Sequence, residues 1–214
     1  MASGGYTYKQ MQDVVRLAMR RQLGDDCRYV DDLVPYTVND AYHEIDRALR
    51  WTRCTYDITT VASDNEYIVP SSVREYLEVK YTTDSDSVRR LEPLSLDEWL
   101  EKQESSTSEG TPSYYIQHGD RVYLYPTPDT DGETLTIYVV GEPPRLAAND
   151  DKPGFPVHLH QLITRLACAR LRQHVGDMEE GMAQELYVQQ KIRQETMDAA
   201  MKRGGSGRVK YHGP

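Results

Sequence analysis

Two histidines, His158 and His160, are spaced like a short metal-binding motif near the start of a predicted helix. Residues two apart at a helix start point to different sides of the helix, and no third ligand follows at a suitable spacing. Zinc sites use three or four ligands that converge on the metal. We therefore expect no metal at this motif, and the sequence predicts no cofactor elsewhere.

Three pairs of neighbouring carboxylates could serve acid/base chemistry: Asp25-Asp26, Asp31-Asp32 and Glu179-Glu180. They lie in predicted polar loops or at helix starts, where carboxylates usually face water or complement the helix dipole. The chain has no Gly-x-Ser-x-Gly nucleophile motif. Gly204–Gly207 lacks the Gly-Lys-Ser/Thr ending of a phosphate loop and is interpreted as a flexible linker. The residues favour a protein that is not an enzyme.

Charge is distributed unevenly along the 214 residues, whose net charge is −9. An acidic protein is not expected to grip nucleic acid over its whole surface. The last residues, from Lys202 to Pro214, carry four positive charges and no acid. A basic, glycine-rich segment after an acidic body predicts docking on a partner, although a solvated tail is the simple alternative.

Cysteine and tyrosine usage adds two expectations. Cys27, Cys54 and Cys168 are odd in number and far apart, which favours assembly in a reducing intracellular compartment over secretion. No apolar run approaches the roughly 20 residues of a membrane span, and the N-terminus has no signal-peptide core. Sixteen tyrosines against one phenylalanine suit half-buried surfaces that meet partners.

Helical periodicity dominates both ends of the chain. Residues 6–24 carry Met11, Val14, Val15 and Ala18 on one side. A second helix is expected to be capped by Thr37, with Asp40 three residues later, and to bury Val38, Ala41, Tyr42, Ile45, Ala48, Leu49 and Thr52. Pro156 opens a third helix that buries Leu159, Leu162, Ile163, Leu166 and Ala167 and stops at Gly176. A last helix, capped by Asp177 and Glu180, has a methionine-rich stripe: Met178, Met182, Leu186, Ile192, Met197 and Met201. It is expected either to pack between subunits or to be an ordinary peripheral helix.

The middle of the chain alternates as strands do. Strands are predicted at 56–62, 66–69 and 76–82, with 71–75 a possible helical turn. A three-stranded antiparallel meander is predicted over 114–146, with Gly119-Asp120 as its first turn and Asp131-Gly132 before its third strand. The earlier strands are expected to pair with this meander. A short helix starts at Ser95, which forms a capping box with Glu98.

These elements predict an α+β fold. Helical segments from the N- and C-terminal parts form a bundle of hairpins, and a small antiparallel β-sheet or sandwich is inserted between them. The expected parts are an N-terminal helical part (1–54), a β region (55–146), C-terminal helices that complete the core (147–202) and a flexible basic tail (203–214). The β region contains the short helix (95–102) and an exposed loop (103–113).

The order of these segments resembles the head–tail adaptor (connector) proteins of tailed bacteriophages. The similar segments are Leu124-Tyr125-Pro126, the strand Leu135–Val140 with Pro143-Pro144, and the helix Phe155–Leu171. The upstream runs VPYTVNDAYHEIDRAL and IVPSSVREYLEVKY also resemble that family. The resemblance covers roughly Leu33 to Gly176.

The resemblance implies a structural role in the virion neck, between capsid portal and tail. Such adaptors form a homo-oligomeric ring, commonly of twelve copies, under the portal. They extend the DNA channel, through which double-stranded DNA passes without sequence-specific binding, and they provide the platform for the tail, its nozzle or a tail-completion protein. An acidic channel would let DNA slide. We expect the tail to dock on the portal through Lys202, Arg203, Arg208, Lys210 and Tyr211, with Gly204–Gly207 as hinge. The expected tail-side interface comprises Glu104, Ser105, Ser106, Thr107, Ser108 and Glu109.

Three other functions stay open on the sequence. A tail-completion or stopper protein of the same neck would differ in its ring partner and symmetry. A virion-associated peptidoglycan hydrolase would need a glutamate with a raised pKa in a cleft. A regulatory DNA-binding protein would bind DNA with a steep salt dependence, which the acidic charge opposes.

Overall fold

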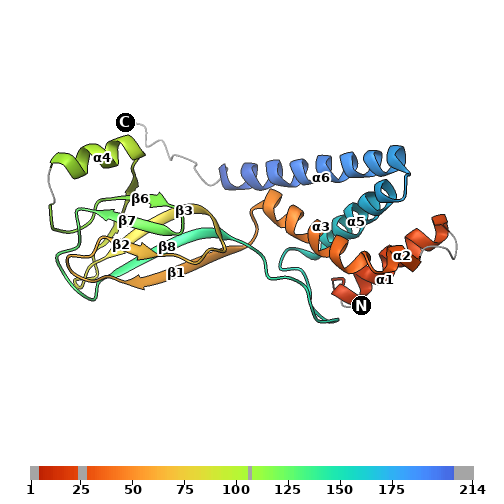
Figure 1. Ribbon diagram of the computed structural model, residues 1–214, viewed down its shortest axis with the longest axis horizontal. Coiled ribbons are helices and arrows are strands. Elements are labelled where there is room, and N and C mark those ends of the chain that lie inside the picture. Colours follow the sequence, from red (N-terminus) through yellow and green to blue (C-terminus); the bar gives the residue numbers. More distant parts are fainter. Residues whose placement is uncertain (1–4, 24–27, 106–107, 205–214) are drawn as a thin grey trace, which may run out of the picture. The chain divides into compact units, whose positions relative to one another are not determined.

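The computed structural model describes residues 5–23, 28–105 and 108–204 and divides the chain into two units (Figure 1). The helical unit is formed within residues 1–51 and 143–214, and the β unit within residues 52–142. Helices and antiparallel strands occupy separate units, which confirms the predicted α+β class. The finer boundaries expected from the sequence, at residues 54, 146 and 202, stay predictions.

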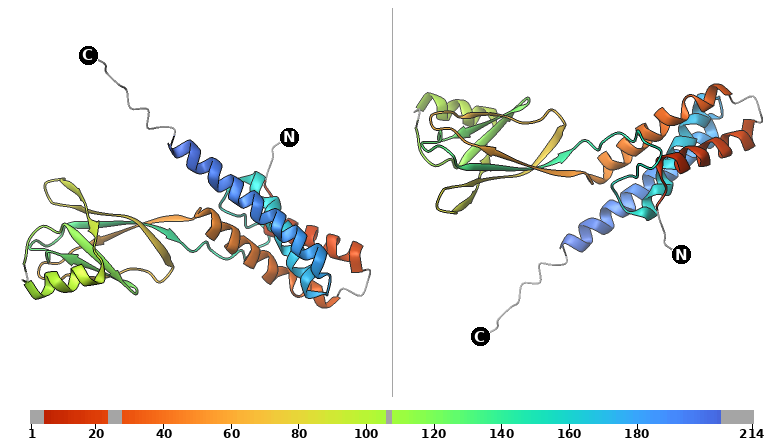
Figure 2. Two further views of the ribbon diagram at one scale, coloured as in Figure 1. Left: turned by 90° about the horizontal axis from the view of Figure 1, so that it is seen from above. Right: turned by 90° about the horizontal axis from the view of Figure 1, so that it is seen from below.

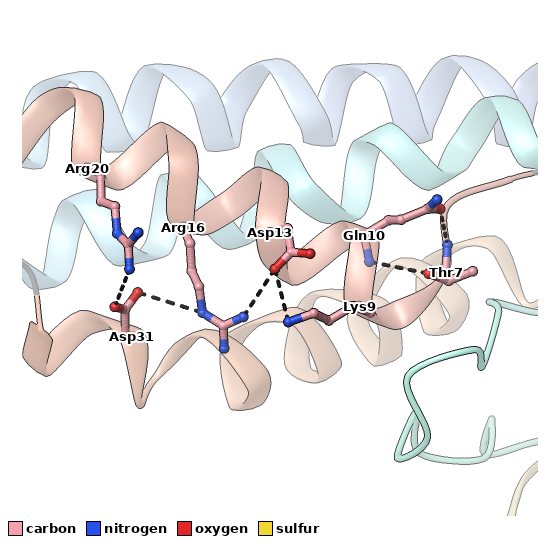
Figure 3. A network of polar contacts seen from close by, with 7 residues as sticks. All are labelled: Thr7, Lys9, Gln10, Asp13, Arg16, Arg20 and Asp31. Atoms are coloured by element: carbon pink, nitrogen blue, oxygen red, sulfur yellow. Dashed lines mark hydrogen bonds and ion pairs between the residues drawn. The ribbon is translucent and has the colours of Figure 1, made fainter.

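The first helix of the helical unit, α1 (Tyr8–Leu23), begins at a reciprocal capping box. The backbone N–H of Gln10 donates to Thr7 Oγ1 at 3.3 Å, and Gln10 Oε1 accepts from the N–H of Thr7 at 2.9 Å (Figure 3). Two otherwise unsatisfied N–H groups at the helix start are thereby bonded. The helix matches the prediction for 6–24, with Met11, Val15 and Met19 fully or almost fully buried.

Two further helices follow. The short α2 (Arg28–Asp31) lies where the sequence predicted only an acidic loop, and α3 (Val34–Leu49) comes next. The predicted cap at Thr37 is wrong, because α3 starts three residues earlier, with Pro35 in its first turn. Proline fits the first turn because the N–H it lacks would have no partner there. Thr37 lies inside the helix, and its hydroxyl donates to the carbonyl of Leu33 at 2.9 Å.

The C-terminal helices complete this unit. A 3-10 turn, η2 (Val157–Leu159), leads into α5 (His160–His174), and α6 (Met178–Gly204) follows. All five residues predicted to be buried on α5 and η2 are buried. Gly176, at φ +94°, ends the helix as predicted, in a conformation that glycine adopts without strain. Helix α5 lies at the centre, packed against α1, α3 and α6 (Figure 2).

The predicted stripe of α6 is divided between two faces of the helix. Ile192 is buried, whereas Met178, Met182, Leu186 and Met197 are each about half exposed, and Val188, which the predicted stripe did not include, is buried. Gly181 sets this orientation, because a Cβ there would lie 2.8 Å from the carbonyl oxygen of Ala169 on α5. The carboxylate of Glu180 accepts hydrogen bonds from the side chains of Arg172 and Gln184. These contacts are not those of the cap that the sequence predicted for Asp177 and Glu180.

The β unit holds two four-stranded sheets. The first has the order β1-β8-β3-β4, all antiparallel, and the second has the order β2-β7-β6-β5, with β5 and β6 parallel. The strands are β1 (Arg53–Thr59), β2 (Glu66–Ile68), β3 (Val73–Thr82), β4 (Val88–Arg90), β5 (Glu92–Pro93), β6 (Tyr114–His118), β7 (Arg121–Tyr125) and β8 (Thr134–Gly141).

The predicted three-stranded meander is only half correct. The hairpin of β6 and β7 turns at Gly119-Asp120 as predicted, with His118 opposite Arg121. The third strand, β8, pairs instead with β1 and β3 in the other sheet, which confirms that early and late strands pair. Pro126 and Pro128 lack the N–H that a ladder needs, so the chain leaves the second sheet there and crosses to the first. Ser71 and Ser72 form a turn, and β3 already begins at Val73.

The core of the β unit is apolar, with one polar cluster. Buried residues from both sheets include Tyr67, Val79, Leu124, Leu135 and Ile137. Tyr81 is fully buried and donates a hydrogen bond from its hydroxyl to the buried carboxylate of Glu133. Burial raises the pKa of Tyr81, and the hydrogen bond to Glu133 raises it further. The hydroxyl of Thr60 lies 3.3 Å from that of Tyr81, so the carboxylate is held by hydrogen bonds within the fold.

Helix α4 (Leu96–Ser105) carries the predicted capping box. Glu98 Oε2 accepts from the backbone N–H of Ser95 at 2.9 Å and from its hydroxyl at 2.7 Å. These hydrogen bonds to the charged carboxylate lower the pKa of Glu98. Trp99 is buried and packs its ring near those of Tyr123 and Tyr125, so α4 is fixed to strand β7.

Candidate assembly surfaces

An open groove of about 530 Å³ runs across three helices of the helical unit. It is lined by residues of the N-terminal segment and α1, of α5 and of α6, among them Tyr6, Val14, Ala18, Thr164, Cys168, Ala183 and Tyr187. Tyr6 and Tyr187 are each 41% exposed although they flank a largely apolar floor. A groove with an apolar floor and tyrosine walls suits contact with another protein surface.

Further apolar side chains are exposed on two of the helices that line the groove. Met178, Met182 and Leu186 follow each other at four-residue spacing on α6, each 49–57% exposed, and on α1 Leu17 is 53% exposed. Single exposed apolar residues are common on proteins, but several of them on the helices that build an apolar groove are typical of an interaction site. We call the groove and these side chains the helical apolar surface.

Charged groups surround the helical apolar surface. On α5, the guanidinium of Arg165 lies 5.0 Å from the ring centre of Tyr187, a cation–π contact that holds the tyrosine at the groove. Arg172 pairs with Glu180 at 2.8 Å across the α5–α6 turn. A polar surface therefore borders an apolar centre, as in protein–protein interfaces.

A separate ion-pair network ties α1 to α2 (Figure 3). Asp31 accepts from Arg20 at 3.0 Å and lies 3.7 Å from Arg16, and Asp13 lies between Lys9 and Arg16 at 3.3 and 3.5 Å. These pairs are largely exposed, so each contributes little to stability. They account for Asp31, one of the carboxylates considered for acid/base chemistry.

The histidine and cysteine side chains are arranged for packing. His160 is buried, with Nε2 2.9 Å from the carbonyl oxygen of Phe155, while His158 is exposed and lies 3.6 Å from Glu195. The two rings do not converge, and within the described ranges no three His, Cys, Asp or Glu side chains are placed to bind a metal. Burial raises the pKa of the Cys168 thiol to about 11, which leaves it protonated and a poor nucleophile.

The carboxylates lend no support to hydrolase chemistry. A glycosidase general acid needs a raised pKa. The pKa values of Glu98 and Asp151 are both lowered, Glu98 by its capping box and Asp151 by the backbone N–H groups of Ala147 and Ala148. Glu133 is buried, but it accepts the hydrogen bond of Tyr81 and has a structural role.

The residues predicted to bind the portal lie at the C-terminal end of the chain. Lys202 and Arg203 belong to the last turn of α6, whereas Arg208, Lys210 and Tyr211 lie outside the described residues. Their role stays a prediction.

The predicted tail-side segment is partly anchored. Glu104 and Ser105 end α4, Ser106 and Thr107 lie outside the described residues, and Ser108 and Glu109 follow. The carbonyl of Ser108 accepts from the N–H of Thr127 at 3.0 Å, and Glu109 accepts from the hydroxyl of Ser63 at 3.1 Å. The second half of the segment is therefore held along the β6–β8 region, with the carboxylate of Glu109 at the surface.

Sequence reasoning missed two contributors to the helical unit. Val14 was expected to be buried but is 40% exposed beside the groove, and Met19 is buried in its place. Asn39, which carries no apolar signal, is buried and bonded to the hydroxyl of Tyr8 at 2.9 Å and to both backbone groups of Leu146. A polar residue within the α3 stripe was the available signal.

Comparison with known proteins assigns the family. Within the described residues no helix is long and apolar enough to cross a membrane. A search of curated proteins gives no match to this chain. The chain matches the family described as SU10 adaptor protein over residues 6–210, which extends the resemblance seen in the sequence from Leu33–Gly176 to the N-terminal helix and most of the basic tail. With its α+β fold, its helical apolar surface and this match, the chain belongs to the SU10 adaptor protein family and is a bacteriophage head–tail adaptor, a structural protein of the virion neck.

Proposed function

We propose that this adaptor assembles into a ring of about twelve copies beneath the portal, extends the DNA channel and carries the tail. The observation that supports the ring is the helical apolar surface, which a single chain leaves exposed. Covering it with a neighbouring copy removes apolar area from water, the main driving force of association. A head-to-tail contact of this kind closes into a ring when its rotation fits.

The acidic charge of the chain supports a passive channel. A net charge of −9 per copy repels the phosphate backbone, so DNA slides through the ring without binding. A DNA-binding regulator would instead need a basic surface and would lose affinity steeply with salt.

The basic C-terminal segment is the proposed portal contact. Lys202 and Arg203 precede the predicted hinge Gly204–Gly207, of which Gly204 is the last residue of α6, and Arg208, Lys210 and Tyr211 follow it. Deleting residues 205–214 is expected to abolish portal binding while ring formation between copies persists. A truncated chain that joins the portal normally would contradict this contact.

The segment Glu104–Glu109 is the proposed tail-side contact. Glu109 presents its carboxylate at the surface of the β unit. Replacing Glu104 and Glu109 by Gln is expected to weaken binding of the tail or tail-completion protein and to leave portal binding unchanged. The reverse result would assign this segment to the portal.

The ring is tested by native mass spectrometry of the purified chain, alone and mixed with its portal. Met182→Glu and Leu186→Glu place charge on the helical apolar surface and are expected to block ring formation without unfolding the chain, since both side chains are already exposed. Val61→Glu, on an equally exposed apolar residue of the β unit, is the matched control. A wild-type chain that forms no ring with any portal would overturn the proposal. A ring on a tail protein alone would favour a stopper role.

A further inference from the structure

Strand β1 forms one edge of the first sheet and has a neighbour, β8, on one side only (Figure 1). Its seven residues pair with β8 in unbroken register, from Arg53 opposite Val140 to Thr59 opposite Thr134. The strand contains no Pro, Gly or Lys and no bulge, the usual features that keep an edge strand from pairing with another chain.

The hydrogen bonds at the two ends of β1 show which of its residues bond to β8 and which point to the open edge. The N–H of Gly141 donates to the carbonyl of Thr52 at 3.0 Å, and the N–H of Thr60 donates to the carbonyl of Glu133 at 2.8 Å. Even-numbered residues therefore bond to β8, because bonded and non-bonded pairs alternate along an antiparallel ladder. The N–H and C=O groups of Arg53, Thr55, Asp57 and Thr59 point away from β8, to the open edge.

These edge groups have no hydrogen-bond partner anywhere in residues 5–23, 28–105 and 108–204. The other edge strands are short: β4 and β2 have three residues each, and β5 has two, one of them Pro93. Residues 73–79 of β3 are also not covered by β4, but register shifts between Val73 and Glu75 and between Tyr76 and Glu78 make this edge irregular. Among the described strands, β1 therefore offers the long regular edge with free backbone groups. Such an edge is a template for a further strand.

The side chains on this edge are complementary to themselves. Arg53, Thr55 and Asp57 are exposed on the same face of the sheet. When a second β1 lies antiparallel with Thr55 opposite Thr55, each Arg53 faces the Asp57 of the other copy. These are the residues whose backbone groups point to the edge, so the pairing that matches charges also matches hydrogen bonds.

The charges of Arg53 and Asp57 are both available for an ion pair with another chain. The carboxylate of Asp57 is fixed on this face by the hydroxyl of Thr136, at 2.7 Å, and accepts no ion pair. Arg53 likewise has no ion-pair partner in the described part of the chain. Opposite charges directly across two antiparallel strands stabilise the pair, and like charges destabilise it.

We propose that free copies of this chain dimerise through β1, antiparallel and centred on Thr55, so that the first sheets of the two copies join into one continuous sheet. The interface is two-fold and self-complementary, so it closes at two copies and does not grow into a ring or a filament. It lies in the β unit and is independent of the helical apolar surface and of the ring proposed above. Its role is to cover the reactive edge before assembly.

Sedimentation of the full-length chain over a range of concentrations, without other virion proteins, tests the dimer. The wild type is expected to show a reversible monomer–dimer equilibrium. Arg53→Asp and Asp57→Arg each put two like charges opposite one another between positions 53 and 57, and the two-fold symmetry makes this happen twice. Each variant is expected to raise the Kd of the dimer roughly tenfold. The double variant R53D/D57R restores opposite charges and is expected to regain the wild-type Kd.

A backbone variant tests the hydrogen bonds independently. Thr55→Pro removes an N–H that points to the open edge, and proline is accepted at edge strands, so the dimer is expected to be lost while the fold persists. Thr55→Val keeps the N–H and is the matched control. Circular dichroism of each variant reports whether it is folded. If Thr55→Pro unfolds the chain, the Arg53 and Asp57 variants alone test the dimer.

Other results would overturn the proposal. A wild type that stays monomeric at all concentrations has no such interface. A dimer that is unaffected by the charge variants but is broken by Met182→Glu uses the helical apolar surface. A double variant as weak as the single variants shows that Arg53 and Asp57 do not face each other.

Discussion

Asn39 is the residue that joins three separate parts of the helical unit. Its amide donates to the hydroxyl of Tyr8, the carbonyl of Pro35 and the carbonyl of Leu146, and accepts from the N–H of Leu146. Every polar atom of the side chain is thus bonded inside a core, where an unmade hydrogen bond costs the full desolvation of the group left behind.

Replacing Asn39 by Leu is therefore expected to destabilise the chain. Both backbone groups of Leu146 would stay buried without partners, and the Tyr8 hydroxyl would keep only its hydrogen bond to the carbonyl of Pro35, which lowers the free energy of unfolding by about 3 kcal/mol. Chemical denaturation measures the change. Asp40→Asn, at the exposed neighbouring position, is the control and is expected to shift it by less than about 0.5 kcal/mol. Equal effects of both variants would contradict this role.

The capping carboxylate of Glu98 makes a pH-dependent contribution to α4. Its pKa lies below the ordinary glutamate value of 4.5, first because the hydroxyl of Ser95 donates to it and then because the Ser95 N–H does. A lowered folded-state pKa means that the stabilisation is complete above the ordinary value and is lost as the pH falls through the lowered value.

An NMR titration of the Glu98 carboxyl carbon is expected to give a midpoint below 4.5. In Ser95→Ala the hydroxyl contact is gone, so the midpoint moves up towards the ordinary value. Asp151, whose pKa is lowered by the backbone N–H groups of Ala147 and Ala148, serves as an internal reference and is expected not to move with the substitution. A midpoint unchanged by Ser95→Ala would rule out the hydroxyl as the main cause.

At the scale of elements, local signals in the sequence predicted the helices well, but they predicted poorly which strands pair and which helix faces are buried. Capping at Ser95, the stop at Gly176 and the stripe of α5 depend on residues close in sequence, so the sequence contained them. The partner of β8 depends on where the chain runs after Pro126, and α6 has apolar residues on more than one face, so periodicity identified the buried Ile192 but not Val188. The exposed methionine-rich stripe of α6 was expected to pack between subunits or to lie at the periphery, whereas Val14, expected to be buried on α1, lies beside the groove.

Gly181 decides how closely α6 approaches α5. An added Cβ would lie 2.8 Å from the carbonyl oxygen of Ala169 and 3.1 Å from the backbone nitrogen of Gln173, atoms that cannot move without distorting α5. Ala gains about 1 kcal/mol over Gly in a helix interior, but overpacking against backbone costs about 1–3 kcal/mol.

Gly181→Ala is thus expected to lower the melting temperature, against its helix propensity. Gln189→Ala, on the exposed side of α6, is expected to leave it unchanged or to raise it slightly. Thermal unfolding followed by circular dichroism compares them. A stabilised Gly181→Ala would mean that the two helices separate readily at this point.

At the scale of the whole molecule, the β unit contains what an independent domain needs. It has its own buried cluster from both sheets, and its two ends are joined where the N–H of Gly141 donates to the carbonyl of Thr52.

A fragment of residues 52–142 is accordingly expected to fold alone. It should give a dispersed amide NMR spectrum and one cooperative thermal transition. A narrow spectrum with no transition would show that the helical unit is needed to form the β unit.

The hydrogen bond between Thr52 and Gly141 also has an evolutionary consequence. The chain leaves the helices and returns to them through two strand ends that are already side by side, so the whole β unit occupies the position of a single surface loop. Recombination can exchange such an insertion for another without moving a helix. The helical unit and the β unit can therefore diversify at different rates.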